Sequence, residues 1–491
     1  MRVTSAAALA PRIGADLLGA DVPLGPGVVL DSRQATAGAL FIALPGERVN
    51  GRDFAAAAVA AGAAGVMAHE PIPGLPDSVA QLVVPGEPTE GLVRLARELV
   101  AQECSRGLSV VGLTGSSGKT STKDLLAQLL PRLGATIAPP GSFNNEIGLP
   151  LTATSVDATT RFLVAEMGAR GRGHIAWLCQ VTPPNIGMVL NVGQAHAGEF
   201  GGLDATAQAK GELVEAASDW VVLNADDPRV LGMRERRGAG VRTALWRSSD
   251  QPAPEAELQL WADQIGADDR DRHHFVLHAH DGQSHDRAAV QLASSGRHQV
   301  DNALAAATTA RLLGMPLEAV AAGLADAELK SRWRMEISEL QLAGGAATIV
   351  NDAYNANPDS MAAAIASAAA IHRRRGAGRL ILVLGDMLEL GEGAQAEHRR
   401  LGELADAAGA HLMVAVGEYA EDMVAGVGLR VSARTATDPH AATRIVAESV
   451  APQDVVLIKA SRGLALETVV TGLDEATLAE ARVDQERGVE R

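Results

Sequence analysis

At 491 residues the chain is too long for a single compact core, and at about 150 residues per domain its length predicts about three domains. Hydrophobic residues make up 47% and charged residues 21% of the composition, which allows large cores and excludes extensive disorder. The formal net charge of −16 argues against a general nucleic-acid-binding protein, because tracking a phosphate backbone needs a basic face.

The first hundred residues contain short apolar runs broken by glycine and proline, and an alanine-rich stretch, Phe54–Ala68, whose pattern predicts a helix. From Leu108 onward, apolar runs end in polar, glycine-rich loops that lead into helical patterns. Runs of this length are typical of strands buried on both faces of a parallel sheet. The predicted strands are Leu108–Leu113, Phe162–Ala165, Ile186–Leu190 and Trp220–Leu223.

A second series of strands follows a charged junction at Lys330–Glu336. Before it, the polar segment Gln251–Arg287 is expected to form surface β structure or an insertion, and Val300–Leu313 a helix. The strands after it alternate with helical patterns, which predicts βαβ units; they are Ala347–Val350, Leu380–Leu384, Leu412–Val416 and Val455–Ile458. We therefore predict an α/β protein of three domains, with boundaries that give residues 1–105, 106–330 and 331–491.

The cysteine content and the apolar segments indicate the cellular compartment in which the protein is expected. Cys104 and Cys179 are the two cysteines, which excludes a disulfide framework and a cysteine-based zinc site. The first apolar stretch is interrupted by Pro11 and Arg12, unlike a signal peptide, and the longest uncharged stretch, Gly173–Gly198, contains a proline pair, unlike a membrane span. We expect a reduced, soluble, cytoplasmic protein without a membrane or nucleic-acid partner, and a monomer by default.

The sharpest signal is the segment Val110–Leu130, in which an apolar run leads into a Gly/Ser loop, then Lys119 and Thr120, then a helical pattern. Backbone N–H groups of such a loop converge on phosphate oxygens, and the start of the helix adds a favourable dipole. Lys119 is placed to reach the β- and γ-phosphates, and the Thr120 hydroxyl to bind Mg²⁺. A glycine turn that only caps a helix would not explain the Lys-Thr pair, so we predict ATP binding.

Two of the predicted strands end in side chains that suit a ligand site. Glu166 follows Phe162–Ala165, and His196 lies in the loop after Ile186–Leu190. Ligands of α/β proteins bind at the carboxyl ends of the strands, and Mg²⁺ prefers one or two carboxylates together with phosphate oxygens. A single strand-end glutamate is usually solvated and a single histidine usually structural, but two successive strand ends of this kind favour a functional site for both.

Only five of the 43 basic residues are lysines, so arginine serves wherever a generic cation is sufficient. A lysine kept against this bias has a reason to be a compact or reactive amine. Lys210, in the predicted helix Thr206–Ala216, could pair with phosphate, stay exposed or carry a carbamate, and its spacing does not choose among these. Lys123 is expected to be a solvated helix residue and Lys330 a linker charge.

Together these elements resemble the Mur ligase family, ATP-dependent enzymes that form amide bonds during bacterial peptidoglycan precursor synthesis. The phosphate loop matches the family motif over Thr114–Thr120, and the match extends over essentially the whole chain. The remaining marks point to the branch of the family that adds a terminal dipeptide; they are Asp31–Gly51, Ser142–Thr152, Asn351–Met361, Leu384–Glu392 and Lys459–Gly463.

The resemblance implies a small α/β N-terminal domain that binds the UDP end of the substrate, a central phosphate-loop domain with a mostly parallel sheet that binds ATP, and a Rossmann-like C-terminal α/β domain that receives D-alanyl-D-alanine. It also implies the reaction. ATP phosphorylates the terminal carboxylate of a UDP-muramoyl-tripeptide, and the dipeptide amine then displaces phosphate from the acyl phosphate. Whether the third residue of that tripeptide is lysine or diaminopimelate stays open.

The resemblance further implies roles for individual residues around ATP and Mg²⁺. Asn302 should lie near the adenine, and Arg334 (or Arg332) and Asp352 should reach the nucleotide from the third domain. The family usually has His-Asn where this chain has His298-Gln299, a change that keeps an amide. The phosphate-binding residues implied are Thr114, Gly115, Ser116, Ser117, Gly118, Lys119, Thr120 and Ser121, and the magnesium ligands implied are Thr120, Glu166, His196 and a carbamylated Lys210. Lys119, Glu166, His196 and Lys210 are also the implied catalytic residues.

The substrate-binding residues implied by the resemblance fall into three groups. Ser32 and Arg33 match the UDP-recognition segment, and Asn144 and Asn145 match the loop that faces the tripeptide. The candidates for the dipeptide side are Tyr354, Asn355, Asn357, Ser360, Asp386 and Arg462. Each has a structural alternative: Tyr354 could be core packing, Pro358 could simply start a helix, and Asp386 and Glu389 could enrich a first helical turn.

Two other classes of protein compete with this interpretation. A folylpolyglutamate-type or other amino-acid ligase would share the phosphate loop and Glu166, but not Tyr354–Asn357 together with Leu384–Glu392. A non-catalytic, nucleotide-regulated binding protein would keep the loop without needing a metal-binding carboxylate and two substrate loops. The pair Asp226-Asp227 is expected to form a structural turn.

Overall fold

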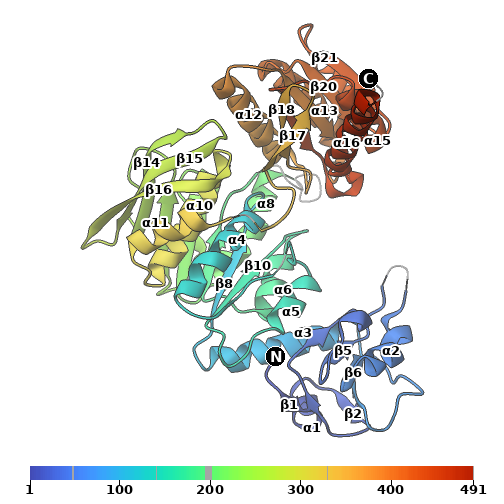
Figure 1. Cartoon of the computed structure of the whole chain (residues 1–491). Coiled ribbons are helices and arrows are strands. Elements are labelled where there is room, and N and C mark those ends of the chain that lie inside the picture. Colours follow the sequence, from blue (N-terminus) through green and yellow to red (C-terminus); the bar gives the residue numbers. More distant parts are fainter. Residues whose placement is uncertain (47–48, 140, 194–201, 329, 490–491) are drawn as a thin grey trace.

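The computed structural model describes residues 1–46, 49–139, 141–193, 202–328 and 330–489, with side chains to residue 478. Three sheets of five, nine and six strands follow one another along the chain, and a two-stranded ladder joins β1 (Thr4–Ser5) to β3 (Pro23–Leu24) (Figure 1). Most neighbouring strands within the three sheets are parallel, and helices cover their faces. The predicted α/β class is confirmed.

The five-stranded sheet is built from the first hundred residues, in the order β2-β7-β6-β5-β4. Its strands are β2 (Asp16–Leu18), β4 (Val28–Val29), β5 (Leu40–Ile42), β6 (Gly65–Ala68) and β7 (Ala80–Val83), with the short helices α1 (Ala6–Leu9) and α2 (Ala55–Ala60). The expectation of one helix over Phe54–Ala68 is therefore wrong in its second half. Gly62, at φ 117°, ends the helical stretch, and the apolar run Gly65–Ala68 becomes a buried strand.

Helix α3 (Glu90–Cys104) links this first sheet to the second. Its buried side chains, such as Leu92, Leu95 and Leu99, belong to one hydrophobic core that also includes Leu163 and Met167 from the second sheet. Figure 1 shows α3 lying between the N-terminal strands and α5 and α6. The first two parts of the molecule therefore share a continuous core.

The nine-stranded sheet has the order β16-β15-β14-β13-β12-β11-β8-β10-β9. The strands from β9 to β14 pair in parallel, and β14, β15 and β16 pair antiparallel, so the polar segment predicted as surface β structure extends this sheet. The bounds are β8 (Ser109–Thr114), β9 (Thr136–Ile137), β10 (Phe162–Glu166), β11 (Ile186–Val189), β12 (Trp220–Asn224), β13 (Arg242–Arg247), β14 (Leu258–Ala267), β15 (Arg272–His280) and β16 (His285–Ser295).

Helices cover both faces of this second sheet. The bounds are α4 (Lys119–Leu129), α5 (Gly148–Ala153), α6 (His174–Val181), α8 (Leu203–Ala216), α9 (Pro228–Gly232), α10 (His298–Leu312) and α11 (Leu317–Asp326). On one face α4, α10 and α11 share a core with the strands, and on the other face α6 and α8 pack near α3. Among the described residues, no helix is both long enough and apolar enough to cross a bilayer.

The six-stranded sheet has the order β17-β18-β22-β19-β20-β21 and is parallel except for the β17–β18 pair. Its strands are β17 (Glu336–Leu342), β18 (Gly345–Asn351), β19 (Leu380–Gly385), β20 (Leu412–Val416), β21 (Ser432–Ala436) and β22 (Val455–Lys459). Two separate cores lie on its faces. The helices are α12 (Pro358–Arg375), α13 (Ala394–Ala407), α14 (Ala420–Ala425), α15 (Pro439–Ala447) and α16 (Thr468–Val489).

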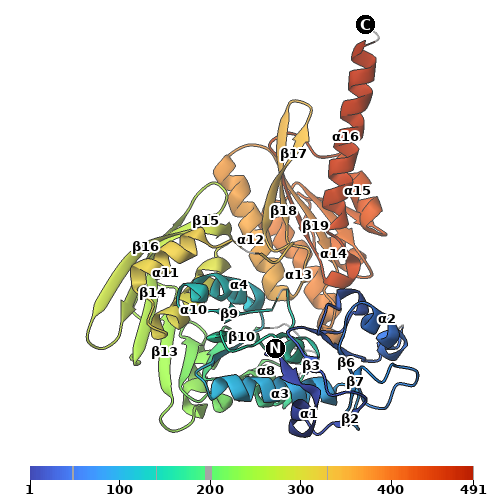
Figure 2. The same cartoon turned by 60° about the horizontal axis from the view of Figure 1, so that its bottom comes forward.

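The turn between β14 and β15 touches α12 of the third part (Figure 2). The buried Asp271 accepts hydrogen bonds from Ser367 Oγ at 2.6 Å and from Arg374 Nη1 at 2.5 Å. This contact fixes the far half of α12 against the second sheet, while the start of α12 reaches the cavity described next.

Candidate active site

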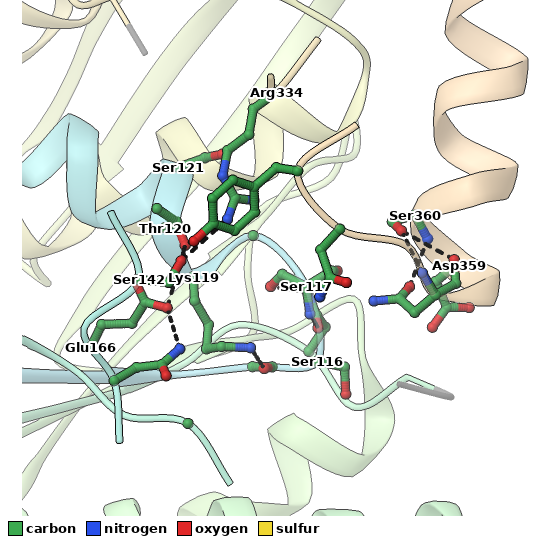
Figure 3. Close-up of a pocket in the computed structure, with 18 of the residues that line it drawn as sticks. Ser116, Ser117, Lys119, Thr120, Ser121, Ser142, Glu166, Arg334, Asp359 and Ser360 are labelled. Carbon is green, nitrogen blue, oxygen red and sulfur yellow. Dashed lines mark hydrogen bonds between the residues drawn. The ribbon is translucent and has the colours of Figure 1, made fainter. Parts of the chain in front are cut away.

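A cavity of about 700 Å³ lies where the phosphate loop, the strand ends of the second sheet and the loops of the third sheet meet (Figure 3). Many of the residues predicted for the site line it together, although they come from distant parts of the sequence. They are Gly115, Ser116, Ser117, Gly118, Lys119, Thr120, Ser121, Asn144, Asn145, Glu166, Lys210, Asn302, Arg334, Asp352, Tyr354, Asn355, Asn357, Ser360 and Arg462.

The phosphate loop joins β8 to α4. Its last residue, Gly118, has φ 80°, and a Cβ there would lie 2.3 Å from Asn302 Oδ1, so only glycine fits. The Ser117 N–H donates to Asn191 Oδ1 at 2.9 Å, and Lys119 Nζ donates to Gly115 O at 2.7 Å. Burial lowers the pKa of Lys119 and the Glu166 carboxylate opposes that shift. The loop thus presents a lysine and a helix N-terminus to the cavity.

Glu166 ends β10 with its side chain fully buried. Its Oε1 accepts hydrogen bonds from Asn144 Nδ2 at 2.8 Å and from Thr120 Oγ1 at 3.3 Å, whereas Oε2 is buried without a hydrogen-bond partner among the described residues. An unsatisfied carboxylate oxygen beside a hydroxyl is costly unless a cation binds there. These oxygen donors suit Mg²⁺, although no group of three or more His, Cys, Asp or Glu side chains in the described part of the chain forms a complete metal site.

Arg334 crosses from the start of the third part to the phosphate loop. Its Nη2 donates to Thr120 Oγ1 at 3.0 Å and to Ser142 Oγ at 3.4 Å, and its guanidinium stacks 4.1 Å from the centre of the Tyr354 ring (Figure 3). Both of its neighbours have left-handed backbone, Trp333 at φ 59° and Met335 at φ 53°. Of the two arginines left open by the sequence, Arg334 enters the cavity, while Arg332 is exposed and does not line it.

Lys210 projects from α8 into the cavity, with only 5% of its surface exposed. Burial lowers its pKa well below the ordinary value, and the charge of Lys119 lowers it further. A lowered pKa favours the neutral amine. This is the form that reacts with CO₂, and the exposed alternative left open by the sequence is wrong.

A second lysine is also more buried than expected. Lys123 was expected on a solvated helix face, but it is buried, forms an ion pair with Asp124 at 2.5 Å and donates to Pro139 O and Gly141 O at 2.9 and 3.1 Å. It thereby fixes the chain just before Ser142. Lys330 is exposed as expected.

Asn302 approaches the phosphate loop from α10. It is buried, and its Nδ2 donates to Gln299 Oε1 at 2.9 Å, so the amide of Gln299 fixes the orientation of Asn302. Asp352 accepts hydrogen bonds from the Lys459 ammonium at 2.6 Å and from the Met335 N–H at 3.0 Å. Two of the residues expected to contact the nucleotide therefore line the cavity from different parts of the chain, Asn302 from α10 and Asp352 from the loop after β18.

The loops expected to contact the peptide substrates also have structural functions. Asn145 Oδ1 accepts the N–H groups of Ile147 and Gly148 at 3.3 and 2.8 Å, and Asn357 and Ser360 form a capping box at the start of α12. Pro358 is the first residue of that helix, as its structural alternative predicted. Asp227 caps α9, so the expected turn at Asp226-Asp227 is also confirmed.

Some predicted site residues are not brought to the cavity. Thr114 is buried in β8, and Ser32 and Arg33 lie in a short 3₁₀ helix of the N-terminal part, where Arg33 pairs with Asp31 at 2.7 Å. Asp386 is turned away, because its carboxylate accepts the N–H groups of Glu418 at 2.7 Å and Tyr419 at 3.1 Å. His196 lies outside the described residues.

The cavity also contains residues that the sequence interpretation did not assign. Four of them lie inside sequence motifs named above: Ser142, Asp359, Glu389 and Lys459. The motifs therefore indicated the segments, but nothing in the sequence indicated which of their residues line the cavity. His174 had no such signal. It lines the cavity at the start of α6, and its Nε2 lies 3.2 Å from Glu146 Oε1.

Comparison with known protein families gives three matches, which together span most of the chain between residues 26 and 462. Three family models match it: "Mur ligase family, catalytic domain" over residues 26–90, "Mur ligase middle domain" over residues 113–310, and "Mur ligase, glutamate ligase domain" over residues 333–462.

Individual relatives match along most of their length. The chain is 42% identical to UDP-N-acetylmuramoyl-tripeptide–D-alanyl-D-alanine ligase of Mycobacterium tuberculosis, with 91% of each chain covered, and 34% identical to the Escherichia coli ligase of the same name, with 94% and 96% covered. A crystal structure of MurF from Acinetobacter baumannii superposes with a TM-score of 0.82 at 28% identity, covering 97% and 99% of the two chains. A structure of MurF ligase from Thermotoga maritima in complex with ADP gives 0.74 at 26% identity, covering 92% and 98%.

Proposed function

The chain belongs to the Mur ligase family, and we propose on that premise that it joins D-alanyl-D-alanine to a UDP-N-acetylmuramoyl-tripeptide at the expense of ATP. It is an ATP-dependent ligase of peptidoglycan precursor synthesis. The observation that carries the proposal is the single cavity in which the phosphate loop faces the Tyr354–Asn357 loop. Neither a folylpolyglutamate-type ligase nor a nucleotide-regulated binding protein explains both walls.

The proposed first step transfers the γ-phosphoryl group of ATP to the terminal carboxylate of the tripeptide. The carboxylate oxygen forms a bond to phosphorus, the bond to the β-γ bridging oxygen breaks, and ADP and an acyl phosphate result. The transfer mainly requires positioning and charge stabilisation. Lys119 and the loop N–H groups hold the phosphates, Arg334 adds a second cation from the opposite wall, and Asn144 stands beside Glu166 to receive the peptide.

The proposed second step forms the amide. The ammonium group of D-alanyl-D-alanine first gives up a proton to water, and the neutral amine then attacks the acyl carbon to form a tetrahedral intermediate. The nitrogen loses its second proton to the departing phosphate, which leaves with the oxygen that came from the carboxylate. The loops of the third sheet, with Tyr354, Asn355 and Arg462, present the dipeptide. A site assembled from separate sheets excludes water, which would otherwise hydrolyse the acyl phosphate.

We also propose that Mg²⁺ is held by Thr120 and Glu166, with His196 and a carbamylated Lys210 as the further ligands. When bound, Mg²⁺ would neutralise charge on the transferred phosphoryl group. The unsatisfied Glu166 Oε2 and the low pKa of Lys210 support this assignment.

The proposed division of labour follows the three sheets. Residues 1–105, with Ser32 and Arg33, take the UDP end of the substrate, residues 106–330 bind ATP, and residues 331–491 bind the dipeptide. We also propose a monomer as the active form.

The test is to incubate the purified protein with ATP, Mg²⁺, UDP-N-acetylmuramoyl-tripeptide and D-alanyl-D-alanine. We expect phosphate release that depends on all four components, and a product whose mass equals the two substrates joined with loss of water. Phosphate release that does not depend on the dipeptide, or a preference for free glutamate as the amine substrate, would contradict the proposal.

A further inference from the structure

Three loops at the carboxyl edge of the third sheet line the cavity. The loop after β18 contributes Tyr354 and Asn355, the loop after β22 contributes Arg462, and the loop after β19 contributes Glu389. Ligands of parallel sheets bind at this edge, so the three loops together form the receptor for whatever the third part binds.

The loop after β19 is fixed residue by residue. Asp386 accepts the two N–H groups described above, the Met387 N–H donates to Nε2 of the buried His398 at 2.8 Å, and the Leu388 N–H donates to Ser461 Oγ at 2.9 Å. The three residues before Glu389 are therefore held by hydrogen bonds, and the position of Glu389 is set by them.

Glu389 itself has φ 66°, in the left-handed region that non-glycine residues rarely adopt. Such backbone persists only where the surrounding structure enforces it, and it concentrates at ligand-binding positions. In this loop, the enforced conformation occurs at a glutamate that lines the cavity, and the loop contacts the Arg462 loop through Leu388 and Ser461.

Four other acids among the described residues line the cavity, and none of them comes from the loop after β19. Glu166 faces Thr120, Asp352 is paired with Lys459 at 2.6 Å, and Asp301 lies within 3.4 Å of Arg297.

The fourth acid, Asp359, is at the start of α12. Its Oδ2 lies so close to Gly193 that a Cβ on that glycine would be 2.0 Å away, and Figure 3 shows Asp359 on the side of Ser116 and Ser117. It therefore belongs to the phosphate-loop side. Asp352 is bound to Lys459, the residue that ends β22, whereas Glu389 comes from the loop after β19, whose Leu388 N–H donates to Ser461 Oγ beside Arg462.

The dipeptide is a zwitterion in solution, so a receptor for it needs a cation for the carboxylate and an anion for the ammonium. Arg462 supplies the cation; its guanidinium stacks 4.3 Å from the centre of the Trp333 ring and pairs with Glu467 at 2.5 Å, which fixes its position at the cavity wall. We propose that Glu389, and not Asp386 from the same motif, binds the ammonium group of the incoming D-alanyl-D-alanine. This inference rests on the proposed function and adds to it the residue that orients the attacking nitrogen.

The test compares Glu389→Gln with Glu392→Gln, an exposed neighbour outside the cavity, in enzyme already shown to need the dipeptide for phosphate release. Glu389→Gln removes the charge while keeping the shape. We expect the KM for D-alanyl-D-alanine to rise about tenfold or more, with the KM for ATP and for the tripeptide unchanged, because a charge-assisted contact is lost in one subsite only. Glu392→Gln should behave as wild type.

A second readout separates a lost contact from a damaged loop. D-lactyl-D-alanine carries a hydroxyl in place of the ammonium, so its inhibition constant against the dipeptide should be the same in wild type and Glu389→Gln. A dipeptide KM within twofold of wild type, or an equal weakening of both ligands, overturns the assignment of Glu389. Wild-type enzyme that releases phosphate without the dipeptide overturns the proposed function instead.

Discussion

The Nη2 atom of Arg334 donates a hydrogen bond to the Thr120 hydroxyl over 3.0 Å, although the two residues are 214 positions apart. Thr120 is in the first turn of the phosphate-loop helix, and Arg334 lies just before the third sheet. The same guanidinium stacks on Tyr354, so one side chain contacts the phosphate loop and the Tyr354 loop at once. On the proposed function, we expect Arg334 to contact the transferred phosphoryl group.

Replacing Arg334 should impair the chemical step more than it impairs folding. Arg334→Lys keeps a charge but loses the flat group that stacks on Tyr354 and reaches two hydroxyls, so we expect kcat to fall by about 10²-fold. The matched control is Arg332→Lys, two residues away and exposed. Steady-state phosphate release measures both; equal effects of the two substitutions would contradict a specific role for Arg334.

Lys119→Ala should remove catalysis and leave the fold intact, because the lysine lies at the cavity wall and, within the described part of the chain, its ammonium donates one hydrogen bond, to Gly115 O. We expect a loss in kcat of about 10²- to 10³-fold with a melting temperature near that of wild type. Lys330→Ala, at an exposed lysine, serves as the control. Retained ATP-dependent phosphate release in Lys119→Ala would contradict the assignment.

Substitutions of Lys210 test whether this residue carries a carbamate. Because its amine is buried with a lowered pKa, Lys210→Ala should lose activity that short carboxylic acids such as acetate partly restore, since they place a carboxylate where the carbamate stood. Lys210→Arg cannot form a carbamate and should stay inactive. The measurement is the rate of phosphate release by each variant with and without added acetate. A fully active Lys210→Arg enzyme would refute the carbamate.

His398 should make stability depend on pH. Burial lowers its pKa from 6.5, and its Nε2 accepts the Met387 N–H, so the folded chain favours the neutral ring. The unfolded chain binds a proton that the folded chain does not; this contribution to stability is full above pH 6.5 and is lost as the pH falls toward the lower folded pKa. Melting temperatures between pH 7.5 and 5.5 should fall more steeply for wild type than for His398→Gln. Parallel curves would show that His398 does not titrate in this way.

The sequence predicted the parallel strands and the phosphate loop well, because both are local patterns. The expected strands Leu412–Val416 and Ile186–Leu190 match β20 and β11 to within one residue. The prediction for the alanine-rich stretch Phe54–Ala68 was partly wrong, because a run of alanines has no hydrophobic periodicity that would distinguish a short helix from the strand after it.

Side-chain orientation inside a motif could not be predicted from the sequence. Asp386 and Glu389 lie three residues apart, and hydrogen bonds with the distant Glu418 and Ser461 help to decide which of the two residues lines the cavity. The choice between Arg332 and Arg334 depends in the same way on left-handed backbone at Trp333, which nothing in its residue type indicates. These contacts are tertiary, so no local pattern records them.

The most direct test of the central claim follows an oxygen atom. The tripeptide is prepared with ¹⁸O in its terminal carboxylate and incubated with the enzyme, ATP, Mg²⁺ and D-alanyl-D-alanine. If the phosphoryl group passes through that carboxylate, the inorganic phosphate released with each amide bond contains one ¹⁸O atom from it. Phosphate free of ¹⁸O, from a reaction that still forms the amide, would contradict the account.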